Sequence, residues 1–211
     1  MIERPILFSA PMVRAILAGT KTHTRRVVKI THRTPGLAAC LTPPIGAPRP
    51  RTAAELCPYG QPGDRLWVRE TWQHSNFPLG PYDESCTVFY RADYMDDPHG
   101  PDGEKSPEGK YRHWVPSIHM FRSASRILLE ITGIRVERLQ DISALDAIAE
   151  GIARDGAGWE RFHVDPDAPR GQSFTRNPVL AYRGLWESIN GAGTWDANPW
   201  VWVIEFRRVA P

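Results

Sequence analysis

The chain has 211 residues, with 26 Lys and Arg against 24 Asp and Glu, and a formal net charge of +2. This near balance excludes the strong overall positive charge of many nucleic-acid-binding proteins, so a positive surface can only come from local clustering. The apolar runs are too short for a membrane span or a signal peptide. We therefore expect a cytoplasmic protein of one domain, over residues 1–211, with a buried hydrophobic core.

The first segments predict a strand, a helix and a second strand. Residues 6–9 form a short apolar strand candidate. Residues 10–19 carry apolar side chains on one helical face, with Pro in the first turn and Gly19, the residue type that most readily closes a helix, at the end. Residues 20–29 then predict a strand that ends in two valines.

Three stretches differ in kind from the rest of the chain. They are rich in Pro, Gly and small or polar residues and have no period of 2 or 3.6: about 31–62, 73–112 and 155–177. We interpret them as irregular insertions over the surface, the second of which contains a short strand candidate at 87–91.

Strands are predicted at residues 63–72, 125–139 and 200–209, the last with Trp200, Trp202, Ile204 and Phe206 on one side. Gly133 lies in the middle of the strongest of these strand signals and predicts a bulge or a sharp bend.

Two helices complete the predicted order of elements. Ser143 is a candidate N-cap for a helix at 144–152. A second helix is expected at 178–189, with Leu180, Leu185, Trp186 and Ile189 facing inward. Because the helices do not separate successive strands, the order favours an α+β fold, a small β-barrel flanked by helices, over a parallel sheet.

The three cysteines form no C-x-x-C pair: Cys40, Cys57 and Cys86. An odd number of cysteines without zinc-ligand spacing is typical of a reduced cytosolic protein. No other cluster of His, Cys and Asp has metal-ligand spacing, so we expect no metal and no other cofactor.

The most informative stretch is ILAGTKTHTRR, residues 16–26. Two hydroxyl and four basic side chains follow the predicted helix there: Lys21, Thr22, His23, Thr24, Arg25 and Arg26. Such a set can bind an anion or activate a nucleophile; the alternative is a solvated strand edge. In an ideal strand Lys21 and Thr24 point to opposite faces, so a shared site requires a bulge or turn at Thr22-His23.

Four blocks, in order, resemble the ASCH domain family, which has a PUA-like fold: ILAGTKTHTRR, PGDRLWVRETW, LQDISALDAIAEGI and WVIEF. They cover roughly half of the chain and are most similar to prophage-type members with long insertions. The resemblance implies a PUA-like barrel and a cleft, beside the first helix and the strand after it, that binds RNA or nucleotides.

One small bacterial branch of that family hydrolyses N(4)-acetylcytidine to cytidine and acetate. Its pattern of a Lys and a Thr three apart after a helix, with a Glu late in a later helix, falls here on Lys21, Thr24 and Glu150. The resemblance thus implies these three as catalytic residues. A Thr hydroxyl needs a base, and a Lys can serve if burial or nearby cations lower its pKa.

Further candidates for binding the nucleoside or RNA are Thr22, His23, Arg26, Arg69, Glu70 and Trp72. The last three lie in LWVRETW, where aromatic and guanidinium groups could stack on a base and pair with phosphate; the alternative is that the tryptophans pack in the barrel. Other basic residues form either a phosphate track or part of a mixed surface: Arg112, His113, Arg122, Arg126, Arg135 and Arg138.

The expected function is therefore hydrolysis of the amide of N(4)-acetylcytidine-type substrates through Lys21, Thr24 and Glu150. Two alternatives use the same basic cleft. One is a non-catalytic RNA-binding module, and the other is a metal-independent ribonuclease in which His23 or Glu150 moves protons. The choice between free nucleoside and RNA, any phage–host role, the oligomeric state and protein partners stay open at this level.

Overall fold

The computed structural model describes residues 1–29, 53–76, 80–94, 113–155, 158–160 and 174–209. Most of the first predicted insertion, and the tip of the second, lie outside these residues. In the described part no helix has the length and apolar character needed to cross a lipid bilayer.

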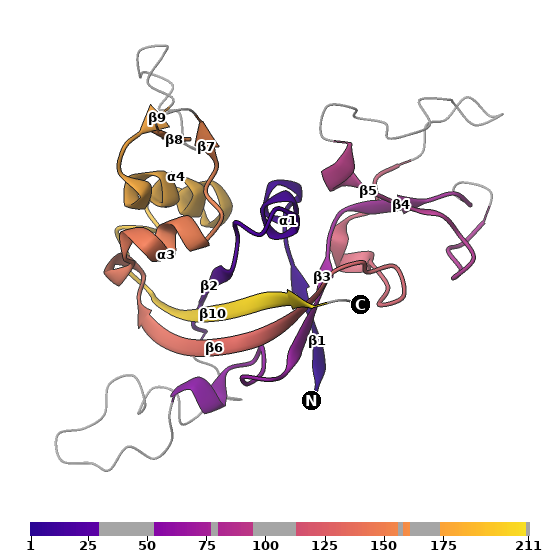
Figure 1. Ribbon diagram of the computed structural model, residues 1–211, viewed down its shortest axis with the longest axis horizontal. Coiled ribbons are helices and arrows are strands. Elements are labelled where there is room, and N and C mark those ends of the chain that lie inside the picture. Colours follow the sequence, from indigo (N-terminus) through magenta and orange to yellow (C-terminus); the bar gives the residue numbers. More distant parts are fainter. Residues whose placement is uncertain (30–52, 77–79, 95–112, 156–157, 161–173, 210–211) are drawn as a thin grey trace.

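A curved five-stranded sheet forms the centre of the molecule (Figure 1). Its strands, in spatial order, are β1 (Glu3–Leu7), β3 (Arg65–Arg69), β6 (Leu128–Arg138), β10 (Trp200–Val209) and β2 (His23–Val27). Strands β1 and β3 are parallel, and the other neighbours are antiparallel. With few helices beside this sheet, the fold class is α+β, as predicted.

The two edge strands β1 and β2 are joined in sequence by helix α1 (Ala10–Leu17). Among the described residues they share no strand pairing, so no closed barrel is present. The Arg26 side chain nevertheless reaches from β2 to β1, where its Nη2 donates a hydrogen bond to the Leu7 carbonyl at 2.6 Å. The opening between these strands positions the site described below.

Both edge strands differ from their predicted bounds. Strand β1 begins at Glu3 because it pairs with β3 from that residue, and it ends before Ser9, which caps α1. Strand β2 begins only at His23, since Lys21 forms an isolated bridge to Glu150 instead of continuing the ladder. Pairing partners far along the chain set these limits.

The bulge predicted at Gly133 is confirmed in the ladder between β6 and β10. Glu205 pairs with Gly133, but Phe206 pairs with Ile131, so Thr132 is the additional residue on β6. A Cβ atom on Gly133 would lie 2.9 Å from Glu205 Oε2, a contact that a movement of the Glu205 side chain could relieve.

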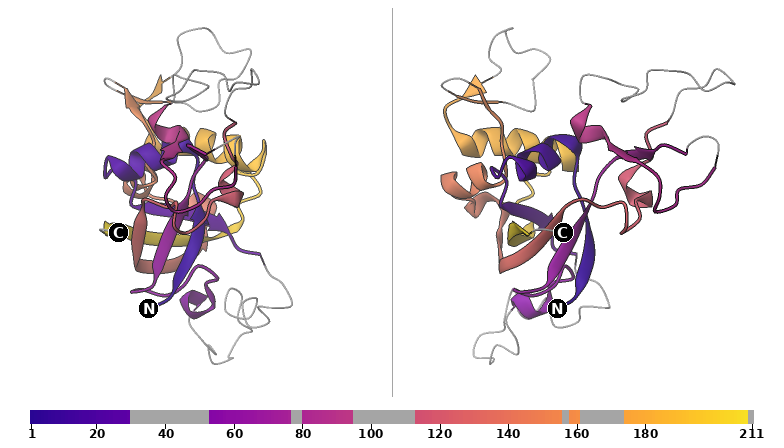
Figure 2. Two further views of the ribbon diagram at one scale, coloured as in Figure 1. Left: turned by 90° about the vertical axis from the view of Figure 1, so that its right-hand side faces the viewer. Right: turned by 45° about the vertical axis from the view of Figure 1, so that its right-hand side comes forward.

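Helices α3 (Ala144–Ala149) and α4 (Pro178–Asn190) pack against each other on the sheet (Figures 1 and 2). The N-cap predicted at Ser143 is confirmed, because its Oγ accepts a hydrogen bond from Asp146 N. Helix α3 ends earlier than predicted and leaves Glu150 as its C-cap.

The predicted inward face of α4 is half wrong. Leu185 and Trp186 are buried, but Leu180 and Ile189 are 48% and 51% exposed. Ala181 and Tyr182 are buried in their place, so the apolar stripe lies about one residue around the helix from the predicted one. Strand β10 contributes to cores on both of its faces, with Trp202, Ile204 and Phe206 on one and Val201 and Val203 on the other.

Two small sheets flank the central one. Strands β4 (Trp72–His74) and β5 (Val88–Tyr90) form a ribbon, which confirms the strand candidate in the second insertion. The third insertion is not wholly irregular: β7 (Arg154–Asp155), β8 (Gly158–Glu160) and β9 (Phe174–Thr175) pair antiparallel. Strands of two or three residues are too short to show a sequence period.

Candidate active site

The chain turns sharply between α1 and β2, and this turn buries Lys21. The amide of Lys21 donates to the Ala15 carbonyl, and that of Thr22 to the Ala149 carbonyl, so the segment is held between α1 and α3. Lys21 and Thr24 are 2% and 3% exposed, whereas Thr22 is exposed to solvent. Regular pairing of β2 begins at His23, and the Thr22 carbonyl accepts from Phe206 N, so the chain leaves the strand at Lys21 and not through the bulge or turn predicted at Thr22-His23.

The Lys21 ammonium group is saturated with acceptors. Its Nζ donates to Glu150 Oε2 at 2.9 Å, to the Glu150 carbonyl at 2.8 Å and to the His23 carbonyl at 2.8 Å. Burial lowers the pKa of Lys21, and the Glu150 carboxylate opposes this shift by favouring the charged form. Three acceptors match the three N–H donors of a charged lysine, so Lys21 carries no free lone pair in this state.

Glu150 is held by a second cation. Its Oε1 accepts from Arg25 Nη1 at 3.1 Å, and the Arg25 guanidinium also contacts Glu137 and Asp146. The side chain of Arg25 is fully buried, with Tyr182 packed against it. Lys21 and Arg25 therefore fix the orientation of the Glu150 carboxylate, and Glu137 and Asp146 hold Arg25 in place.

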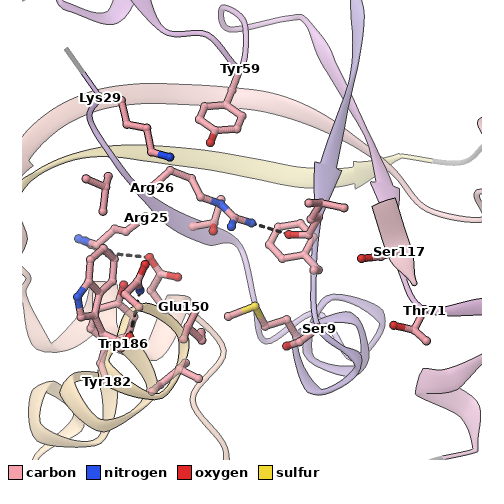
Figure 3. Close-up of a pocket in the computed structure, with 18 residues that line it drawn as sticks. Ser9, Arg25, Arg26, Lys29, Tyr59, Thr71, Ser117, Glu150, Tyr182 and Trp186 are labelled. Carbon is pink, nitrogen blue, oxygen red and sulfur yellow. Dashed lines mark hydrogen bonds and ion pairs between the residues drawn. The ribbon is translucent and has the colours of Figure 1, made fainter. Parts of the chain in front are cut away.

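A cavity of about 570 Å³ lies beside this cluster. It is lined by the end of β1, the start of α1, strand β2 and one face of α4, and Thr24 contributes to its wall. Arg25 and Glu150 also line it (Figure 3). Lys21 is not part of the lining and lies behind Glu150. Within the described residues the Thr24 hydroxyl makes no hydrogen bond, so it is available to a ligand.

The other residues of the KTHTRR run take different positions. Arg26 lines the cavity, with its guanidinium carbon 5.4 Å from the centre of the Phe8 ring. Thr22 and His23 do not line it: Thr22 Oγ1 lies 2.9 Å from His23 Nδ1, and His23 Nε2 faces Asp146 and Glu205 at 3.9 and 3.8 Å.

The residues predicted from LWVRETW lie outside this cavity. Arg69 donates twice to the Met120 carbonyl, and Glu70 is buried against Arg126 at 3.0 and 3.1 Å. Trp72 is buried in a small separate core with Met120. These contacts tie the β4–β5 ribbon to the central sheet, so packing rather than ligand contact accounts for their burial.

The predicted phosphate track consists largely of paired arginines. Arg122 contacts Glu3, Arg126 contacts Glu70 and Asp93, and Arg135 contacts Glu137, Asp146 and Glu205. Arg138 stacks on the Trp200 ring, and Arg112 lies outside the described residues. The interpretation as a mixed surface fits the described members better.

Sequence reasoning missed the residues that complete the cluster around Glu150. Arg25 was considered only as one of the basic residues after the first helix, and Glu137, Asp146 and Tyr182 were not considered at all. The one available signal was the LQDISALDAIAEGI block, which carries Asp146 four residues before Glu150, one helical turn away. Comparison with protein-family models, curated proteins and solved structures finds no match for this chain.

Proposed function

We propose that this chain is an ASCH-type protein with a PUA-like fold that hydrolyses the amide of N(4)-acetylcytidine-type substrates. One observation carries the proposal: Thr24 and Glu150, which are 126 positions apart by their numbers, share the wall of one cavity, and Lys21 is bonded to Glu150 directly behind it. Buried charged groups beside a cavity of this size are typical of a binding or catalytic site.

The cavity chemistry suits an acylated base. A volume of about 570 Å³ falls in the range of pockets that take small organic ligands. The aromatic rings of Phe8 and Tyr182 offer stacking surfaces, while Thr24 and Glu150 offer a hydroxyl and a carboxylate. Amide hydrolysis needs a nucleophile, a base that activates it and a proton donor for the leaving amine.

A proton transfer within the ion pair prepares the nucleophile. Burial already disfavours the charged form of Lys21, and in the proposed step the proton on Lys21 Nζ moves to Glu150 Oε2 along the 2.9 Å hydrogen bond. Lys21 is then a neutral amine with a lone pair, and Glu150 is a carboxylic acid. The amine takes the Thr24 proton while Thr24 Oγ1 attacks the acetyl carbonyl carbon.

The protonated Glu150 then completes the first half-reaction. It donates its proton to the departing N(4) amine, so the C–N bond breaks, cytidine is released and acetyl-Thr24 is formed. Water attacks this ester and gives up a proton to the Glu150 carboxylate, and the Thr24 oxygen leaves with the proton held on Lys21. A proton then returns from Glu150 to Lys21, and the acetic acid product leaves the site and gives its proton to solvent as acetate.

The test is the release of acetate from N(4)-acetylcytidine by the purified protein. Thr24→Ala and Glu150→Gln are each expected to lower kcat by at least about 100-fold, in the range found for lost general acid–base groups. Lys21→Ala should do the same, because it removes the base that takes the Thr24 proton.

Thr20→Ala is the matched control for Thr24→Ala. Thr20 is an exposed threonine of the same segment outside the cavity wall, and its variant should retain the wild-type rate. Wild-type rates no higher than those of all three site variants would overturn the proposed hydrolysis.

A further inference from the structure

The cations of the cavity wall divide into a neutralised and an unneutralised group. Arg25 is surrounded by the carboxylates of Glu137, Asp146 and Glu150. In contrast, Arg26 and Lys29 line the same cavity and have no acidic partner within the described part of the chain. The cavity therefore presents two positive charges that a ligand has to balance.

Arg26 is held in a fixed position before any ligand arrives. Its Nη2 donates to the Leu7 carbonyl at 2.6 Å, and its guanidinium lies over the Phe8 ring. A guanidinium anchored at one nitrogen keeps its other edge for an anion and loses little side-chain entropy when it binds.

Lys29 and Tyr59 lie on the side of Arg26 away from Glu150. In Figure 3 their polar ends approach the Arg26 side chain, whereas Glu150, Tyr182 and Trp186 occupy the other side of β2. Burial raises the pKa of the Tyr59 phenol, and the nearby charge of Arg26 acts in the opposite direction. The phenol therefore keeps its proton at neutral pH and can donate it to an anion.

We propose that Arg26, Lys29 and Tyr59 form a phosphate subsite, and that the cavity takes a phosphorylated nucleoside with its base near Thr24 and Glu150. The identity of the base rests on the proposed function, but the phosphate subsite does not. A phosphate monoester carries nearly two negative charges at pH 7, which two cations and a hydroxyl donor match.

The separation of the two ends matters as much as their charge. Glu150 would repel a phosphate, and its own two cations are already engaged. A phosphorylated ligand therefore has one favourable orientation, with its anionic end at Arg26. A free nucleotide and the terminal nucleotide of an RNA present the same chemistry to this subsite.

The first experiment compares kcat/KM for N(4)-acetylcytidine with kcat/KM for its 5′- and 3′-monophosphates. The second measures the binding of cytidine and of its monophosphates by calorimetry. In wild type we expect at least one monophosphate to have a kcat/KM about tenfold or more above the nucleoside, with tighter calorimetric binding of the matching cytidine monophosphate. This preference should fall as salt rises, because Lys29 is exposed.

Arg26→Met should remove most of the preference for the monophosphate, measured as the ratio of the two kcat/KM values within that variant, so that a general loss of activity does not count as support. Lys29→Met should reduce the preference less, and Arg26→Lys should restore part of it. Arg208→Met, which changes an exposed arginine of β10 outside the cavity, is the matched control and should keep the preference.

Equal kcat/KM values and equal affinities of the wild type for the nucleoside and its monophosphates would overturn the phosphate subsite and would not contradict the hydrolase proposal. So would an Arg26→Met variant, folded by circular dichroism, that loses both activities in equal proportion. If a cytidine monophosphate binds in a way that depends on Arg26 but no acetate is released, the subsite is supported and the proposed hydrolysis is contradicted. Tighter binding of an oligonucleotide with a terminal phosphate than of the free nucleotide would assign the subsite to RNA ends.

Discussion

Lys21 and Glu150 form an ion pair almost without contact with water, with side chains 0% and 3% exposed. Removing two charges from water costs several kcal/mol for each ion, and an apolar pair of similar size is often no less stable. Arg25 and two backbone carbonyls offset part of that cost here. A gain in stability is therefore not a sufficient explanation for this buried pair.

Removing one member of this pair should lower the free energy of unfolding far more than replacing both members by apolar residues. Lys21→Met is expected to lower the free energy of unfolding by about 3–5 kcal/mol, because it leaves a carboxylate buried against fewer partners. The double variant Lys21→Met with Glu150→Leu should recover much of that loss. Urea denaturation measures both, with Lys29→Met as a control expected to change by less than about 0.5 kcal/mol.

Tyr90 makes a pH-dependent contribution far from the site. Its hydroxyl donates to the Ala124 carbonyl, and burial raises the pKa of its phenol to about 12. The unfolded chain loses this proton near pH 10, so between pH 10 and about 12 the folded state holds more protons and stability falls as pH rises.

At pH 11 the wild type should therefore have lost about 1 kcal/mol more than Tyr90→Phe, each compared with its own value at pH 9. Urea denaturation at the two pH values checks this. Parallel losses in both proteins would contradict the assignment to Tyr90.

At the scale of elements, the end of α3 is packed directly on the turn that carries Lys21. Gly151 follows Glu150 with φ +79°, and a Cβ atom there would lie 2.7 Å from Lys21 Cβ and 2.9 Å from Ala15 Cβ. Glycine thus allows α1, the Lys21 turn and α3 to meet. This three-way contact aligns the two halves of the proposed site.

Gly19 is a natural comparison for Gly151. It has a similar φ of +74°, but a Cβ atom there would meet nothing within 4 Å. Gly19→Ala should cost only the backbone strain of about 1–2 kcal/mol. Gly151→Ala should cost at least about 1 kcal/mol more and lower acetate release, because the clash displaces Lys21. Equal unfolding free energies and rates for the two variants would show that the contact has no role.

For the whole molecule, the central sheet and the β4–β5 ribbon have separate cores. Strand β10 pairs on both edges, with β6 and β2, and contributes to two hydrophobic clusters. The ribbon packs on a smaller cluster that contains Trp72 and Met120. The site therefore stands on the more extensively paired part of the fold.

Native-state hydrogen exchange should reflect this division. Amides in the middle of β10 are expected to exchange only by global unfolding, while those of β4 and β5 exchange through a local opening of lower free energy. Mass spectrometry of peptic fragments resolves the two regions. Equal protection of ribbon and β10 would mean that the ribbon and the sheet unfold as one unit.

Local patterns were sufficient for many elements. The helix after residue 10 and the cap at Ser143 were predicted because each depends on neighbours within a few residues. The bulge at Gly133 was predicted from the glycine within a strand signal, although its pairing partner is the distant strand β10. The face of α4 was misjudged at Leu180 and Ile189, because the sequence does not say which side of an apolar stripe meets the sheet. The roles predicted for Arg69, Glu70 and Trp72 stay predictions, although their contacts lie elsewhere.

The sequence by itself determined which residue types stand after α1 and roughly where most of the longer strands and helices lie. Only the tertiary structure decided that Lys21 lies behind Glu150, that Thr24 faces the cavity and that Arg26 meets no carboxylate among the residues described. The physical reason is distance along the chain. Burial and charge pairing depend on distant partners such as Glu150, which is 129 residues from Lys21. The residues next to Lys21 in the sequence do not show that this contact forms.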